Sequence, residues 1–219
     1  MTEPNPEFPA DQSWQDRGGA SWVRQQERID VQLDPFGRAV LGKLGPQAGE
    51  RALDVGCGSG QTVLELAELV GPSGRVVGVD ISEQMLARAR ERVRAQGYGA
   101  VELVLGDAQT HALPPDQDLE FSRFGVMFFQ DSVAAFRNLF AALRAGGRLG
   151  FVCWQAMTKN EWAQVLLQAV LPILPKPALP PMLQPDRPGP FYFDSPERIS
   201  SILSAAGFGS IEIEPFERP

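Results

Sequence analysis

The chain has 219 residues, 43% of them apolar and 21% charged, and a net charge of −7. This length and composition predict one globular domain whose core is large enough to fold without disulfides. The acidic balance argues against a nucleic-acid partner, because such proteins need a basic surface. The densest basic run, residues 88–94, is interrupted by an acid and is expected to be the solvated face of a helix.

The amino-terminal sequence and the cysteines bear on location. Residues 1–6 have neither a basic nor an apolar signal region, and no apolar stretch is long enough to span a bilayer, so we expect a cytoplasmic protein. Cys57 and Cys153 follow strands that we expect to lie roughly 9–10 Å apart, two steps of ~4.8 Å, beyond the ~7 Å reach of a disulfide. With one histidine in the chain, we expect no metal site.

Residues 1–46 are predicted to form an amino-terminal tail and a helical lid. Residues 1–12 are polar and rich in proline, which predicts a frayed end. Residues 13–44 carry two helical patterns, one through Trp22 and Ile29 and a second that starts after Pro35. Gly45-Pro46 ends this segment, and the main domain is expected to occupy residues 47–219.

From Arg51 onward, strand and helix patterns alternate. Apolar runs predict strands at 51–56, 76–80, 101–105, 119–124 and 148–154, and helical periodicity follows the first, second and fourth of them. Ser82 and Asp131 are expected helix N-caps, and Gly97 and Gly146 are expected to stop those helices. The alternation predicts an α/β fold with a doubly wound, mostly parallel sheet and helices on both faces.

Residues 155–194 break this rhythm. A helical pattern over 161–171 is followed by eight prolines between positions 172 and 190, which predict an exposed, stiffened insertion that we expect to act as a lid. Ser195 and Pro196 then begin a helix that Gly207 ends. Residues 210–216 alternate isoleucine with glutamate, and this predicts a final strand.

The most specific signal is the glycine pattern after the first strand. Gly56, Gly58 and Gly60 let the backbone approach a ligand, and a helix whose first N–H groups are unpaired begins directly after them. Asp80 ends the next strand, where an acid accepts hydrogen bonds from a ribose diol. Gln61 stands where a dinucleotide fingerprint needs its third glycine. The pattern therefore predicts a nucleoside-containing cofactor other than a dinucleotide.

Together with residues 106–108 (GDA) after the third strand, these residues resemble the class I S-adenosylmethionine-dependent methyltransferases. Residues 122–129 (SRFGVMFF) and 145–149 (AGGRL) are similar to the methyltransferase-11 group, which is related to ubiquinone and menaquinone biosynthesis. The resemblance covers residues 50–154. It implies a Rossmann-like sheet of order 3-2-1-4-5 plus a C-terminal strand, with a helical N-terminal cap. It also implies S-adenosyl-L-methionine as cofactor and S-adenosylhomocysteine as product.

The resemblance also implies a set of cofactor residues at the carboxyl ends of the strands. The glycines give backbone contact, Asp54 steadies the loop or meets the ammonium, and Asp80 takes the ribose. Ile81 lies against the adenine, whose edge Asp107 and Ala108 read. The full expected set is Trp22, Asp54, Gly56, Cys57, Gly58, Gly60, Asp80, Ile81, Asp107, Ala108 and Arg123. Ordinary alternatives are tight-turn glycines, a helix-capping Asp80 and a loop acid at 107.

No catalytic constellation stands out in the sequence. Methyl transfer from a sulfonium mainly requires alignment and exclusion of water, and a base is needed only for a protonated nucleophile. His111 is a candidate base or an exposed loop histidine, and Arg123 is a candidate acceptor anchor or the partner of an internal acid. Residues 122–125 lack the Asn/Asp-Pro-Pro-aromatic turn of enzymes that methylate amino groups in macromolecules. This absence and the acidic charge indicate a small-molecule acceptor.

Aromatic residues of the predicted lids and of the loop at 127–129 are candidates for the acceptor pocket. They are Trp22, Phe36, Phe128, Phe129, Trp154, Trp162, Phe191 and Phe193. Such a pocket favours an apolar or aromatic acceptor, although each ring alone is more often a packing residue. Two other functions stay open, a nicotinamide-dependent oxidoreductase and a catalytically silent cofactor-binding protein. The glycine spacing and the lack of a Tyr-x-x-x-Lys pair disfavour the first.

Overall fold

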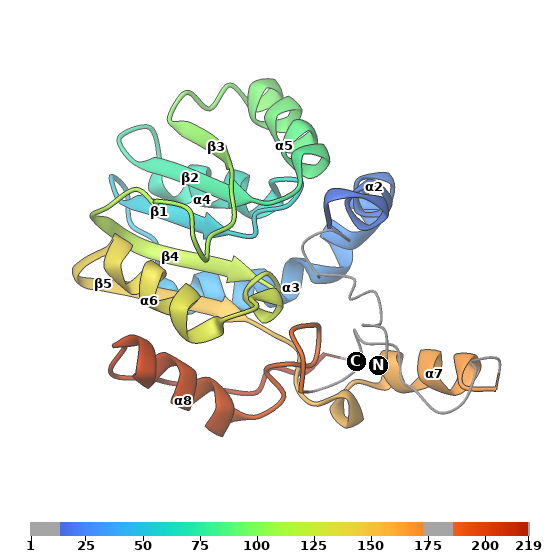
Figure 1. The fold of residues 1–219 in the computed structure, drawn as a ribbon. Helices are drawn as coiled ribbons and strands as arrows, with labels where there is room; N and C mark the ends of the chain where they lie inside the picture. The colour runs from blue at the N-terminus through green and yellow to red at the C-terminus, as the bar shows by residue number, and fades with distance from the viewer. Residues whose placement is uncertain (1–13, 173–185, 219) are drawn as a thin grey trace, which may run out of the picture.

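The computed structural model describes residues 14–172 and 186–218. Five strands form one parallel sheet in the order β3-β2-β1-β4-β5, as the family resemblance implied (Figure 1). The order reverses between β1 and β4, and in open sheets of this kind the ligand crevice lies outside the carboxyl ends of the strands at that point. The strands are β1 (Arg51–Val55), β2 (Arg75–Asp80), β3 (Val101–Leu105), β4 (Gln117–Arg123) and β5 (Leu143–Val152).

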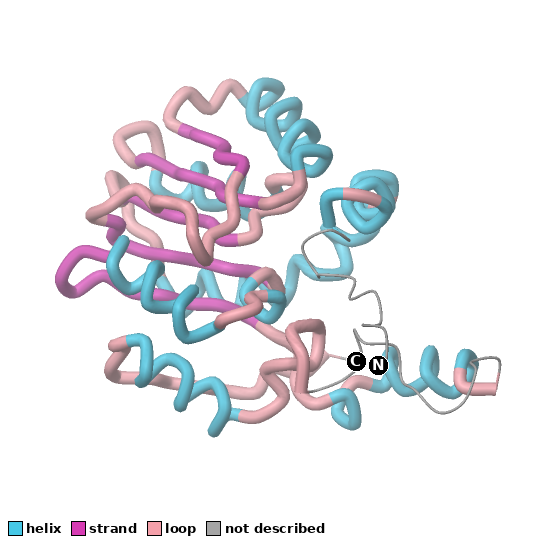
Figure 2. The backbone as a smooth tube through the Cα atoms, viewed as in Figure 1, coloured by secondary structure: helices cyan, strands magenta, loops and turns pink. Residues whose placement is uncertain are grey.

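Helices cover both faces of this sheet (Figure 2). On one face, α3 (Gln26–Leu44) packs on β4 and β5, α4 (Gln61–Val70) on β1 and β2, and α5 (Glu83–Gln96) on β2 and β3. On the other face, α6 (Ser132–Ala142) packs on β5, and α8 (Pro196–Ala206) packs on α6.

The remaining helices lie outside these two layers. The N-terminal α2 (Arg17–Arg24) packs on α5, and α7 (Glu161–Val170) lies at the periphery (Figure 1). Two short 3-10 helices, η1 (Val126–Phe128) and η2 (Met157–Lys159), follow β4 and β5. A helical segment therefore precedes the sheet, as the predicted N-terminal cap requires.

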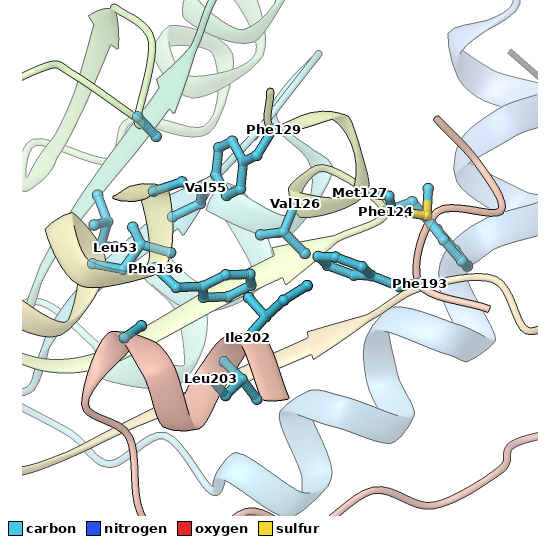
Figure 3. Close-up of a cluster of buried hydrophobic side chains, with 14 of the residues drawn as sticks. Leu53, Val55, Phe124, Val126, Met127, Phe129, Phe136, Phe193, Ile202 and Leu203 are labelled. Carbon is cyan, nitrogen blue, oxygen red and sulfur yellow. The ribbon is translucent and has the colours of Figure 1, made fainter. Parts of the chain in front are cut away.

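A buried cluster lies between the sheet and the helices on each of its two faces, because successive strand residues point to opposite faces. Leu53 and Val55 of β1 belong to the cluster under α6 and α8, whereas Ala52 belongs to the cluster under α4. Figure 3 shows Phe136 of α6 packed with Ile202 of α8 against the sheet. Burying a side chain such as Leu53 or Phe136 completely contributes about 2–3 kcal/mol.

The helix ends follow the local sequence. The side chains of Ser82, Asp131 and Ser195 each accept a backbone N–H bond from the first turn of their helix, at 3.5, 2.9 and 3.2 Å. Gly97 and Gly207 end α5 and α8 with φ of 74° and 110°, a left-handed conformation that glycine adopts without strain. These predicted capping residues are confirmed.

The helix boundary predicted at Pro35 is wrong. The break lies at Gln25, with φ −105° and ψ 8°, and Pro35 stands inside the continuous helix α3. A proline inside a helix removes one hydrogen bond and costs about 3 kcal/mol. Helix α3 buries Leu33 before the proline and Gly37 and Leu41 after it. Packing along the whole helix outweighs the local penalty.

The boundary between α6 and β5 also differs from the prediction. Helix α6 ends at Ala142 rather than Gly146, and β5 begins at Leu143 rather than at residue 148. Leu143 pairs with Gln117 of β4, across a shift in register between Gln117 and Leu119. Strand pairing therefore begins before the glycines that were expected to stop the helix.

The predicted C-terminal strand at 210–216 is wrong. No strand follows β5 in the described residues, which continue to 218. The segment leaves α8 through Ser210 at φ 53°, and its side chains are largely exposed, including Ile213. Glu214 instead forms an ion pair with Lys43, and the ring of Phe216 contacts that of Phe36, 5.6 Å between centroids. An alternating pattern predicts a strand only where one face becomes buried.

None of the described helices combines the length and apolarity needed to cross a membrane. Two expectations fall mainly on residues outside the described part of the chain. These are the frayed end at 1–12 and much of the proline-rich insertion, since residues 1–13 and 173–185 are not described.

Candidate functional site

The loops after β1 and β4 meet through their main chains. Gly56 has φ 71°, and a Cβ placed on it would lie 3.0 Å from the Cα of Gly125. A Cβ on Gly125 would lie 2.8 Å from the carbonyl oxygen of Val55, to which the Ser122 hydroxyl donates at 2.7 Å. Glycine is required on both sides of this contact. The arrangement leaves bare backbone at the point where the strand order reverses.

The N–H groups of the glycine loop are used within the protein. Gly56 and Cys57 donate to the carbonyl oxygen of Val79 at 2.9 and 3.1 Å. Gly58 donates to Oδ2 of Asp80 at 2.8 Å. The loop is therefore held in shape by β2, and it presents main-chain surface rather than free donors at these positions.

Asp80 lies at the tip of β2 and is only 6% exposed. Its second oxygen, Oδ1, accepts the backbone N–H of Ser82 at 2.8 Å, so the carboxylate also braces the start of α5. Burial raises the pKa of Asp80, and the backbone N–H bonds oppose that shift. Asp80 therefore has the predicted capping role and also lies at the carboxyl edge of the sheet. Each carboxylate oxygen accepts about two hydrogen bonds, which leaves acceptor capacity for a ribose diol.

Asp54 has an unused oxygen near the same end of the sheet. It is fully buried in β1, its Oδ2 accepts the Thr62 hydroxyl, and its Oδ1 has no partner among the described residues. Burial raises the pKa of Asp54 to about 7, against the opposing effects of Thr62 and Arg123. A buried carboxylate without a partner is costly, and a cationic group is the partner that fits it.

The side chain of Cys57 points away from the crevice. A Cβ on Gly78 of β2 would lie 2.9 Å from Sγ of Cys57, and the thiol belongs to the buried cluster under α4. Burial raises the pKa of this thiol well above its usual range. Cys57 therefore offers a cofactor its main chain only. Cys57 and Cys153 are both free thiols.

Arg123 points toward α3 and α4. Its Nη1 donates to Oε1 of Gln61 at 2.6 Å, and its Nη2 lies 3.7 Å from Oδ1 of Asp30. The same Asp30 lies 3.0 Å from Arg92 of α5. Two roles were expected for Arg123, and in the structure it pairs with an internal acid, Asp30. Nothing in the sequence singled out Asp30 or Arg92, because acidic and basic residues are common on the exposed faces of helices.

The N-terminal helices lie close to the ends of β2 and β4. A Cβ on Gly19 of α2 would lie 2.5 Å from Oγ of Ser82, which follows β2. The ring of Trp14 contacts the rings of Trp22 and Phe128, at centroid distances of 5.4 and 5.2 Å. Phe128 ends η1, which follows β4. Trp22 thus lies near the end of β4. Trp14, which contacts both Trp22 and Phe128, was not among the residues expected at the site.

The residues expected at the adenine follow β2 and β3. The Asp107 carboxylate accepts the backbone N–H of Gln109 at 2.9 Å and the side-chain amide of Gln109 at both of its oxygens, at 3.1 and 3.0 Å. Ala108 is buried, and its carbonyl accepts the amide of Asn138 at 2.8 Å. Ile81 is half-buried between Asp80 and Ser82. Asp107 is a braced loop acid, at the same edge of the sheet as Asp80.

His111 does not lie with Arg123. The ring of His111 stands over Gly106, where a Cβ would come 2.8 Å from it, and lines a cavity of about 170 Å³. Leu53 and Val77, which line the same cavity, belong to the cluster under α6. Arg123 contacts α3 and α4 on the opposite face. The structure therefore separates the two catalytic candidates.

A row of contacting aromatic rings flanks the crevice at the ends of β4 and β5. Phe124, with φ 59°, stacks on Trp154 at 4.2 Å and an interplanar angle of 20°. Phe36 of α3 meets both rings edge to face, at 5.7 and 5.4 Å. Trp162 of α7 lies 5.3 Å from Trp154 and 5.9 Å from Phe191. We call these five residues the aromatic wall.

Two of the other predicted pocket rings are packing residues. Phe129 and Phe193 are almost fully buried and contact Phe136 of α6, at 5.9 and 6.1 Å (Figure 3). Phe124 was not expected in the wall, and its left-handed backbone has no signature in the sequence. A non-glycine residue with positive φ stores about 1–3 kcal/mol of strain, which the surrounding rings offset.

Comparisons with known proteins agree with this geometry. The Methyltransferase domain family matches residues 52–147. Aklanonic acid methyltransferase DauC of Streptomyces sp. (strain C5) is 34% identical over 158 residues, 68% of this chain and 72% of that protein. The chain belongs to the S-adenosylmethionine-dependent methyltransferase family.

Two further relatives in this methyltransferase family share shorter parts of their length with the chain. Nocamycin O-methyltransferase of Saccharothrix syringae is 31% identical over 185 residues, 80% of this chain and 64% of that protein. Demethylmenaquinone methyltransferase of Geobacillus kaustophilus is 37% identical over 111 residues, 49% of this chain and 47% of that protein. The chain thus spans less than two thirds of these two relatives.

Solved methyltransferase structures share the fold. A SAM-dependent methyltransferase from Aquifex aeolicus has a TM-score of 0.64 at 22% identity, over 86% of this chain and 87% of that one. A Haemonchus contortus phosphoethanolamine N-methyltransferase in complex with S-adenosyl-L-methionine has a TM-score of 0.60 at 27% identity, over 82% and 38%. The cofactor of the family is S-adenosylmethionine. The unpartnered Asp54 oxygen and the side-chain-free backbone of Gly56 and Gly125 fit its cationic amino-acid end.

Proposed function

We propose that this methyltransferase moves a methyl group from S-adenosylmethionine to a small apolar or aromatic acceptor. The observation that carries the proposal is the aromatic wall, which flanks the main-chain crevice at the end of β4. Phe124 belongs to the wall, and Gly125, the next residue, packs against Gly56 of the glycine loop. An acceptor ring against the wall is therefore close to the reacting methyl group.

We place the donor along the carboxyl ends of β2, β1 and β4. Its ribose meets Asp80, and its adenine lies near Ile81, Asp107 and Ala108. Its ammonium meets the unpartnered Oδ1 of Asp54, and its tail follows the bare backbone of Gly56. This arrangement uses the acceptor capacity that the structure leaves at the two aspartates.

Bound S-adenosylmethionine supplies an electrophilic methyl group on a sulfonium. The residues of the chain then have three tasks, which are to align the acceptor, to exclude water and to hold both ends of the donor. The wall suits the first two, because flat apolar rings orient a planar acceptor and displace solvent. We assign the described parts of the N-terminal segment and of the insertion, residues 14–46, 155–172 and 186–194, to the lids that complete the site.

No histidine base is part of the proposal, because the ring of His111, the one histidine of the chain, lines a separate cavity to which no residue of the aromatic wall contributes. An acceptor that reacts from an ionised oxygen or an activated carbon requires no such base. The names of the relatives support a small organic acceptor, since they are methyltransferases of aklanonic acid, nocamycin and demethylmenaquinone. The net charge of −7 supports the same choice over nucleic acid.

Turnover with labelled S-adenosylmethionine and a panel of acceptors tests the proposal. We expect label to move to planar aromatic or quinone acceptors and not to small polar amines. Labelling of the polar amines alone would contradict the aromatic acceptor.

A fluorescence change on adding NAD or NADP, without binding of S-adenosylhomocysteine, would support the oxidoreductase. The fold also occurs in a structure described as a [4+2]-cyclase, so binding without turnover would indicate a different or silent function.

The proposal includes a cytoplasmic location, which the two free thiols support, because thiols persist in reducing compartments. Fractionation of the source cells tests it. Recovery of the protein with secreted or membrane fractions would contradict this part of the proposal without affecting the chemistry.

A further inference from the structure

A cluster of polar side chains joins helix α3 to the glycine loop. Gln26, Asp30 and Asp34 are spaced four residues apart on α3, so they lie along one stripe of that helix. This stripe meets α4, α5 and β4 through hydrogen bonds and ion pairs. None of the three residues was expected at the site.

Asp30 is the centre of this cluster. Its Oδ2 lies 3.0 Å from Nη1 of Arg92, its Oδ1 lies 3.7 Å from Nη2 of Arg123, and the Gln26 amide donates to Oδ2. The three charged side chains are 14%, 20% and 11% exposed, in the order Asp30, Arg92, Arg123. One carboxylate therefore lies between two guanidinium groups that come from different elements of the fold.

Each arginine holds one flank of the glycine loop. Arg92 donates to the carbonyl oxygen of Ser59 at 2.9 Å, and Arg123 donates to the side chain of Gln61 at 2.6 Å. Ser59 and Gln61 stand on either side of Gly60, which has φ 83°. Through the two arginines, Asp30 is connected to both sides of the turn that leads into α4.

The low exposure makes these contacts stronger than ordinary surface ion pairs, which water and salt screen. Replacing the Asp30 carboxylate would leave two guanidinium groups without their shared counter-charge, and like charges repel. Both arginines would then be free to turn toward solvent. The carbonyl of Ser59 and the side chain of Gln61 would lose the groups that fix them.

We propose that Asp30 is a positioning residue for the amino-acid end of the methyl donor. It acts through Arg92 and Arg123 on residues 59–61, whereas the adenosine end depends on Asp80, which Gly58 and Ser82 hold independently. This inference rests on the donor placement described under the proposed function. The alternative is that Asp30 only ties α3 to the body of the protein.

Two ligands separate these roles. S-adenosylhomocysteine carries the adenosine and the amino-acid tail, and methylthioadenosine carries the adenosine without the tail. In isothermal titration of Asp30→Asn, we expect S-adenosylhomocysteine to bind about tenfold more weakly, a change of about 1.4 kcal/mol. We expect the dissociation constant of methylthioadenosine to stay within about twofold.

Matched variants complete the experiment. Glu27→Gln removes one negative charge from the exposed side of the same helix and should leave both ligands unaffected. Arg92→Gln should reproduce the selective loss, and the double variant with Asp30→Asn should lose less than the sum of the two. Arg92→Gln also serves as the test if thermal unfolding shows that Asp30→Asn does not fold.

The outcomes are distinct. Equal weakening of both ligands, or a lowered melting temperature with unchanged affinity for S-adenosylhomocysteine, would show that Asp30 is only structural and would overturn the inference. Failure of the unmodified protein to bind either ligand would instead contradict the donor site itself. A wild-type protein that binds both ligands, with a variant that loses only the tail-dependent affinity, supports the positioning role.

Discussion

The two halves of the sheet's carboxyl edge consist of different kinds of groups. The half over β1 and β2 consists of main chain and buried carboxylates, within residues 54–82 of the chain. The half at β4 and β5 consists of the aromatic wall, whose members lie between positions 36 and 191. Most of the proposed donor half is thus encoded in one short segment, to which Asp107 and Ala108 are added after β3. The acceptor half exists only once distant segments have come together.

The halves also differ in how closely they are packed. Glycine is required at Gly56, where an added methyl group would lie 3.0 Å from the Cα of Gly125. In the wall, Phe124 and Phe191 are buried, but Trp162 keeps 42% of its surface exposed. Changes in the first half should therefore alter stability and donor binding, and changes in the second should alter acceptor use. Variants at Asp80, Gly56 and Trp154 test this difference between the two halves.

Asp80→Ala has the largest expected effect. It removes the proposed ribose acceptor and leaves the N–H groups of Gly58 and Ser82 without their carboxylate partner. Hydrogen bonds to a charged group are worth about 1.5–3 kcal/mol each, so we expect S-adenosylhomocysteine to bind about a hundredfold more weakly in isothermal titration. Asp80→Asn keeps one acceptor oxygen and should lose less. Unchanged binding by Asp80→Ala would remove the donor from this strand end.

Gly56→Ala tests the contact between the two loops. The new methyl group combines a positive φ with a 3.0 Å approach to the Gly125 Cα, and we expect the free energy of unfolding to fall by about 2–4 kcal/mol. Gly97→Ala is the control, because Gly97 has φ 74° and nothing within 4 Å of an added Cβ. Chemical denaturation of both variants measures the difference. Equal losses would mean that the loops do not meet closely.

Trp154→Ala tests the wall. Loss of its stack on Phe124 should raise the KM for an aromatic acceptor about tenfold, since aromatic pairs and their buried area contribute about 1–2 kcal/mol. The dissociation constant of S-adenosylhomocysteine should stay within about twofold. Phe140→Ala, which removes an exposed ring from α6, serves as the control. A variant that loses donor affinity and keeps its acceptor KM would reverse the assignment of the two halves.

Glu120→Leu has the smallest expected effect and concerns the core under β4. Both carboxylate oxygens of Glu120 are buried without a partner among the described residues, and burial raises its pKa well above the usual range. Its ionisation therefore opposes folding above its unfolded pKa of about 4.3, and this cost grows as pH rises toward the folded pKa.

We expect the leucine variant to gain no stability near pH 4 and about 1–2 kcal/mol near pH 8, measured by denaturation across that range. Glu102→Gln on β3 is the control, because Glu102 is exposed and paired with Arg75. A gain that is the same at both pH values would contradict the raised pKa. The contrast with Asp80, whose two oxygens accept backbone N–H groups, would then have no energetic meaning.

The local structure of the half over β1 and β2 was readable from the sequence, because contacts between near neighbours in the chain determine it. Glycine spacing, the terminal Asp80 and the capping Ser82 act within a few residues of one another. Asp30 was not readable, since a polar stripe on a helix predicts a solvated face equally well. Its role appears only when Arg92 and Arg123 arrive from two other elements.

The failed predictions have the same origin. Pro35 suggested a helix boundary, but packing of α3 on both sides of it determines the outcome. Residues 210–216 alternate like a strand, but no buried face receives them, and Glu214 pairs with Lys43 instead. The left-handed Phe124 depends on rings that tertiary structure supplies. Local patterns hold where local contacts dominate, and they fail where distant packing decides.

A crystal structure of the protein with S-adenosylhomocysteine tests the central claim most directly. The account predicts ribose hydroxyls within hydrogen-bonding distance of the Asp80 carboxylate, with the amino-acid tail between Asp54 and the backbone of Gly56. The ligand at another edge of the sheet, or a ribose that makes no contact with Asp80, would contradict it.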